Sequence, residues 1–222
     1  MKKVNHLGCV LEENNSMKTD ILSKRSQFIA RVNSLIQELH FVDSSIMVGL
    51  IRTYATSFYG SGLWDLCSNE CSKVYNSWSV TMRNVLNIDR RTHRHLIVPM
   101  SRSIHLKTML LSRYVKFYHS LVNSPKFSVR FVSRLFENDR RTVLGRTISY
   151  LCRECGLNRS SDLDKLTPGL VKQHVGFGLI PENGQWMASV ASEFLHARDS
   201  GYSLDGFSKD EIDEMLEYVC TS

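Results

Sequence analysis

The 222-residue sequence contains no apolar run of the roughly 20 residues that a membrane-spanning helix needs. Its first residues also lack the apolar segment of a secretory signal peptide. Six cysteines are too few for a disulfide scaffold in a chain of this length, and we expect reduced thiols. These absences predict a soluble chain that buries a core of its own, as one domain or two small ones.

The motifs of common enzyme classes are also missing. The chain has no Gly-rich phosphate loop, no Gly-x-Ser-x-Gly elbow and no His-Glu-x-x-His pair. It lacks the two adjacent aspartates after a strand that would hold the metal ions for nucleotidyl transfer. We therefore expect no catalytic residue and no cofactor in this chain.

Positive charge is concentrated in the first two thirds of the sequence. Residues 1–150 carry 22 Lys and Arg against 10 Asp and Glu, whereas residues 151–222 carry 6 against 12. Between residues 83 and 146 there are 14 basic side chains, eleven of them Arg, against three acidic ones. Because a guanidinium group binds phosphate oxygens through two hydrogen bonds, this asymmetry favours a nucleic-acid partner over a merely solvated basic surface.

Apolar residues recur mostly at helical spacing, which predicts a mainly α protein. One short strand is predicted near the start, over Val4–Leu11. Asp43 and Ser44 offer an N-cap for the second of five helices. The apolar stripes of these helices are, in chain order, Ile21, Phe28, Val32, Leu35 and Leu39; Ile46, Met47, Leu50, Ile51, Tyr54 and Phe58; Val74, Trp78, Met82 and Val85; Met109, Leu110, Tyr114, Phe117 and Leu121; and Val129, Val132 and Leu135 or Phe136.

Proline and glycine mark where the helical pattern stops. The polar stretch "NIDRRTHRHLIVPMSRS" contains Pro99 and predicts a connection, and Ser124 followed by Pro125 predicts the start of the fifth helix. After about residue 150, "LTPGLVKQHVGFGLIPENGQW" is typical of a loop. Ser208 and Glu211 then form a capping box for a terminal helix. We expect a basic helical region over 1–150 and an acidic, loop-rich segment over 151–222.

The aromatic residues among these cations could stack on bases. Trp78 and Phe117 lie on apolar stripes, so we expect them in the core. Tyr118, beside Lys116 and His119, is the strongest candidate for an exposed ring. Further candidates are Trp64, Tyr114 and Phe127.

The cysteines leave a metal site open as an alternative. Cys152 and Cys155 form a Cys-x-x-Cys pair, and Cys67 and Cys71 are four residues apart. Zinc bound by two such pairs would make the chain a zinc-dependent nucleic-acid-binding protein, although no zinc-knuckle composition surrounds them. The metal content of the purified protein would test this alternative. His93 and His95 lie among arginines, whose charge disfavours a bound cation.

Four blocks of sequence resemble, in order, the region after the catalytic palm in reverse transcriptases of non-LTR retrotransposons. The blocks are "NHLGCVLEENNSMKTDILSKRSQFIARVNSLIQEL", "IRTYATSFYGSGLWDL", "VYNSWSVTMRNVLNIDRRTHRHLI" and "LLSRYVKFYHSLVNSPKFSVR". They cover roughly residues 5–150. The resemblance implies a helical thumb that grips an RNA or DNA template–primer by its backbone, without regard to base sequence. It also implies a palm region before Leu7 and Gly8 that would be a further partner, and it is compatible with residence in the nucleus.

No catalytic residue carries over from this family, because its paired metal-binding aspartates lie in the palm, which has no counterpart here. The residues that we predict to bind nucleic acid are Lys18, Lys24, Arg25, Arg31, Arg90, Arg91, Arg94, Arg102, Arg113 and Lys116. A second hypothesis is a non-catalytic helical interaction protein, or a retrotransposon remnant without function, with an apolar surface that binds a partner.

Overall fold

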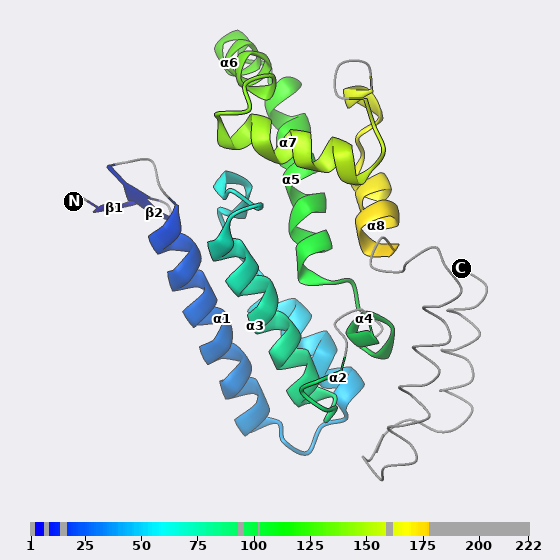
Figure 1. Ribbon diagram of the computed structural model, residues 1–222. Coiled ribbons are helices and arrows are strands. Elements are labelled where there is room, and N and C mark those ends of the chain that lie inside the picture. The colour runs from blue at the N-terminus through cyan, green and yellow to red at the C-terminus, as the bar shows by residue number, and fades with distance from the viewer. Residues whose placement is uncertain are drawn as a thin grey trace. The chain divides into compact units, whose positions relative to one another are not determined.

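The computed structural model describes residues 3–6, 9–13, 17–92, 96–101, 103–158 and 162–177. Within them the protein is mainly helical, as predicted (Figure 1). The elements are β1 (Lys3–His6), β2 (Cys9–Glu12), α1 (Lys18–Glu38), α2 (Ser44–Leu50), η1 (Ile51–Ala55), η2 (Ser61–Leu63), α3 (Asn69–Val85), α4 (Ile97–Met100), α5 (Leu106–Val122), α6 (Phe127–Glu137), α7 (Val143–Glu154), η4 (Leu163–Lys165) and α8 (Pro168–Phe177). None of the helices in these ranges is long and apolar enough to cross a membrane.

The chain divides into two compact units, and α1 and α3 each contribute to both. The first unit takes its described residues from Met1–Ser26, Phe58–Tyr75 and Ile104–Gly178. The second takes them from Gln27–Ser57 and Asn76–Ser103. The predicted boundary near residue 150 falls inside α7, and the predicted terminal helix at Ser208 lies outside the described residues.

The N-terminal part of the first unit is a small hairpin. β1 pairs antiparallel with β2, with Lys3 opposite Glu12 and His6 opposite Cys9. The single strand predicted over Val4–Leu11 is therefore two strands, and their backbone hydrogen bonds are made to each other. Leu7 and Gly8, which we expected to lie against a palm, are outside the described residues.

A buried carboxylate joins this hairpin to the rest of the unit. Asp20 of α1 accepts one hydrogen bond from the backbone N–H of Val10 (2.9 Å) and another from Nε1 of Trp64 (2.8 Å). Both Asp20 and Trp64 are buried. Because each carboxylate oxygen has a donor, the charge is buried with its hydrogen-bonding requirement met.

The turn that returns the chain to Trp64 uses two left-handed backbone conformations. Phe58 has φ 35° and Gly60 has φ 81°. Phe58 is buried, with its ring edge-to-face on Trp64 at 5.8 Å between centroids, so packing offsets the backbone strain. Gly60 lies against Cys9, and a Cβ at this position would overlap the Cys9 sulfur.

α5 is the central helix of the first unit. It packs against η2, α6 and α8, and α8 lies alongside it in Figure 1. Its fully buried side chains include Leu106, Leu110, Leu111 and Val115. α8 corrects our prediction of a loop: Oγ1 of Thr167 accepts a hydrogen bond from the N–H of Leu170, and Pro168 occupies the first helical position.

The core of the second unit is formed by side chains from α1, α2, η1, α3 and α4, and from the residue before α4. These are Phe28, Val32, Met47, Val48, Ile51, Trp78, Met82, Leu96, Ile97 and Met100. Asp43 caps α2 as predicted, since its side chain accepts a hydrogen bond from the N–H of Ser45 (2.7 Å). Pro99 lies inside α4 rather than in a connection; it is in the first turn, where no N–H is needed for the helix.

Two predicted apolar stripes are wrong in part. After α2 the chain continues as the π-helical turn η1, whose wider period rotates the following side chains. Tyr54 is therefore 62% exposed, whereas Ala55 is buried. Within α2 itself, Ile46 is 57% exposed and Val48 is buried, so the buried face differs from the predicted one. The second error concerns α6, which begins at Phe127 instead of Pro125. It buries Ser133 but leaves Val132, Leu135 and Phe136 between 42% and 59% exposed, and Val132 and Phe136 line a pocket together with Ser133.

Candidate nucleic-acid interface

The loop after α3 presents two predicted phosphate-binding residues to solvent. Arg90 and Arg91 are both exposed. Behind them, Nε and Nη2 of Arg83 donate hydrogen bonds to the carbonyl oxygen of Thr92, at 3.1 and 2.6 Å. Asp89 accepts a hydrogen bond from the N–H of Arg91 (2.6 Å), which forms an Asx turn. These bonds fix the loop, so less freedom is lost when its arginines bind an anion.

A polar pocket of about 540 Å³ opens at this loop. It is lined by Arg83, Asn84, Asn87, Ile88, Asp89, Arg90 and Arg91. Asn87 has a left-handed backbone (φ 51°), a conformation that asparagine tolerates better than most residues. The guanidinium and amide groups can donate to phosphate and sugar oxygens, and both amides are contributions that the sequence did not predict.

The four predicted residues of α1 are in different surroundings. Lys18 is 3.8 Å from Glu70, and Lys24 and Arg25 are half-buried. Arg31 is exposed, and its Nη1 donates a hydrogen bond to Oγ of Ser57 (3.2 Å). Only part of the cationic surface of α1 is thus directed to solvent.

The two remaining described residues that we predicted to bind nucleic acid lie in α5. Lys116 is exposed. Arg113 is half-buried, and this burial lowers the pKa of its guanidinium. Arg94 and Arg102, together with His93 and His95, lie outside the described residues.

The stacking residue that we predicted is in the core. Tyr118 is only 5% exposed, and its hydroxyl donates a hydrogen bond to Oε2 of Glu137 (2.8 Å). Trp78 is buried as expected, and Trp64 and Tyr114 are buried as well. The large aromatic side chains that do reach solvent include Phe127 and Phe131 of α6. Phe131 gave no sequence signal, since it did not belong to the predicted buried stripe or to the candidate stacking rings.

The cysteines do not form a metal site in the part of the chain that the structure describes. No group of three or more Cys, His, Asp or Glu side chains gathers there. Burial raises the pKa of Cys67 to about 11, that of Cys71 to about 12 and that of Cys155 to about 11. These thiols are protonated at neutral pH in the metal-free protein, so zinc would have to displace their protons on binding. Zinc bound by Cys67, Cys71, Cys152 and Cys155 gains no support from this arrangement.

No known protein family, curated protein or solved structure matches this chain.

Proposed function

We propose that this chain is the thumb and C-terminal region of a non-LTR retrotransposon RNA-directed DNA polymerase. In this proposal it has no catalytic residues of its own and binds template–primer nucleic acid through the phosphate backbone. The observation that carries the proposal is the loop after α3, where Arg90 and Arg91 stand exposed on a backbone held by Arg83. Contacts of this kind position a protein on nucleic acid without reading its sequence.

Binding should weaken steeply as salt rises. Each phosphate contact releases counterions, so the logarithm of the affinity falls by about 0.9 per contact for each unit of log salt concentration. We expect an Arg90→Glu/Arg91→Glu variant to reduce this slope by about two and to weaken binding about tenfold or more. Fluorescence anisotropy of a labelled RNA–DNA duplex, titrated with the full chain between about 50 and 200 mM salt, measures both quantities.

The matched control is Lys165→Glu/Lys172→Glu. It changes the net charge by the same amount and alters two exposed side chains in the region after residue 150. This control should keep the salt slope of the wild type. Equal losses for both variants would show that net charge alone drives binding, and a wild-type affinity that does not respond to salt would refute the proposal.

The exposed face of α6 favours a second candidate, a helical interaction protein. This helix exposes an apolar stripe that consists of Phe127, Phe131, Val132, Leu135 and Phe136. Exposed patches of this kind often mark contact sites for other proteins. Light scattering and the binding of a dye to exposed apolar surface distinguish this candidate from the first.

A further inference from the structure

The outer face of α6 carries two parallel phenylalanine rings. Phe127 is 72% exposed and Phe131 is 58% exposed. Their centroids are 6.0 Å apart and their planes differ by 22°. The two residues are one helical turn apart, so their rings lie on the same face of the helix.

Positive charge surrounds this pair. Arg134 is exposed and lies three residues after Phe131 and seven after Phe127, which places it on the same face. Residues 126–142 contain five basic side chains and two acidic ones. Glu137 accepts the hydrogen bond of Tyr118, and Asp139 pairs with Arg141 at 3.0 Å on the surface, so an excess of basic side chains remains in this segment. This excess favours an anionic ligand.

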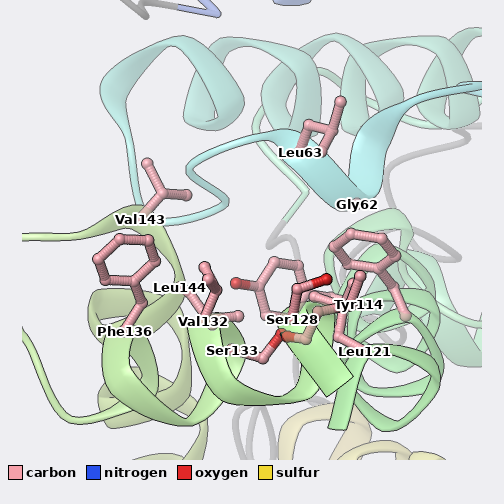
Figure 2. A pocket seen from close by; sticks show the side chains of 12 residues that line it. Gly62, Leu63, Tyr114, Leu121, Ser128, Val132, Ser133, Phe136, Val143 and Leu144 are labelled. Atoms are coloured by element: carbon pink, nitrogen blue, oxygen red, sulfur yellow. The ribbon is translucent and has the colours of Figure 1, made fainter. Parts of the chain in front are cut away.

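Other apolar side chains of α6 line a cavity instead of an open surface. Figure 2 shows Val132 and Phe136 at a cavity that Leu63, Leu121 and Leu144 also line. This cavity, about 470 Å³ in volume, is formed by η2, α5, α6 and α7 with the residues beside them. Phe127 and Phe131 are not among its lining residues. The ring pair thus belongs to the part of the exposed stripe of α6 that lies outside the cavity.

We infer that Phe127 and Phe131 stack on the bases of an unpaired nucleic-acid strand, with Arg134 on its phosphates. This inference rests on the proposed function and names the single-stranded part of the partner as the ligand of α6. Aromatic rings stack on base faces, and a duplex shows only base edges in its grooves.

A Phe127→Leu/Phe131→Leu variant tests the inference, because it keeps apolar surface but removes the aromatic faces. We expect its affinity for a labelled oligothymidylate single strand to fall by about tenfold or more, and its affinity for an RNA–DNA duplex to change less than about twofold. Phe131→Trp should bind the single strand at least as well as wild type. Phe136→Leu, a change at the cavity, is the control and should bind both probes normally. Circular dichroism checks that each variant is folded.

Three results would overturn the inference. If the double leucine variant binds the single strand as wild type does, the rings do not stack on bases. If it loses duplex binding equally, the effect is general and the face is not selective for unpaired bases. If the wild type is a dimer, and Phe127→Ser/Phe131→Ser makes it monomeric without loss of single-strand binding, the face is a dimer interface that binds a second copy of the chain. In all three cases, the proposed function stands if the wild-type protein binds the duplex with a steep salt response. If the wild-type protein binds neither the single strand nor the duplex, the inference and the proposed function are both refuted.

Discussion

Replacing Trp64 by alanine should reduce the free energy of unfolding by about 3–5 kcal/mol, the range for removing a fully buried aromatic side chain. Trp64 is completely buried, and its indole N–H is one of two donors to the Asp20 carboxylate. The substitution leaves a cavity beside Phe58 and also leaves one buried carboxylate oxygen without its donor. Chemical denaturation followed by far-UV circular dichroism measures this loss.

Two further variants separate the two contributions. Trp64→Phe keeps a six-membered aromatic ring but removes the N–H and the rest of the indole, so it should cost less than Trp64→Ala but at least about 1–3 kcal/mol, the penalty for a buried polar group that loses its partner. Tyr59→Ala is the control: this neighbouring side chain is exposed, and its removal should change stability by less than about 0.5 kcal/mol. If Trp64→Ala is no more harmful than Tyr59→Ala, the buried carboxylate does not hold the hairpin in place.

Gly145→Ala should destabilise the protein by about 1–3 kcal/mol or more, although alanine is the better helix former. Gly145 is buried in the first turn of α7, after the connection from α6. A Cβ there would overlap the carbonyl group of Asp139 and lie 2.9 Å from the carbonyl oxygen of Phe136. Both neighbours are backbone atoms, so they cannot move aside as a flexible side chain could.

Gly49→Ala in α2 is the matched control, since a Cβ at Gly49 meets nothing within 4 Å. This variant should be unchanged or more stable by about 0.5–1 kcal/mol, because alanine restricts the unfolded chain. The same denaturation experiment compares the two. If the two substitutions have the same sign and size, the close approach at Gly145 has no energetic consequence.

Local sequence signals predicted where helices lie and begin better than they predicted which of their faces are buried. Asp43 caps α2 because capping depends on neighbouring residues in the chain. The exposed stripe of α6 could not be foreseen, because periodicity shows that a helix has an apolar face but not whether other elements cover it. The loop predicted around Thr167 and Pro168 is a helix for a local reason that we misjudged: the same two residues that suggest a turn also start helices.

In the candidate site, too, some features were predictable from local sequence and others depend on tertiary contacts. Arg90 and Arg91 are exposed as expected, because a polar, arginine-rich segment between helices rarely enters a core. Tyr118 is buried because Glu137, nineteen residues later, supplies a partner for its hydroxyl. Arg83, which holds the loop, was not predicted either, since its hydrogen bonds to the Thr92 carbonyl depend on how the loop folds back.

The contact between Gly60 and Cys9 has a consequence for the evolution of this chain. No side chain fits at position 60 while a cysteine occupies position 9, and the backbone at position 60 also disfavours anything but glycine. A larger residue at position 9 would press on the same turn. In a set of related sequences, we therefore expect glycine to persist at position 60, position 9 to stay small, and any exception at one position to be accompanied by a compensating change at the other.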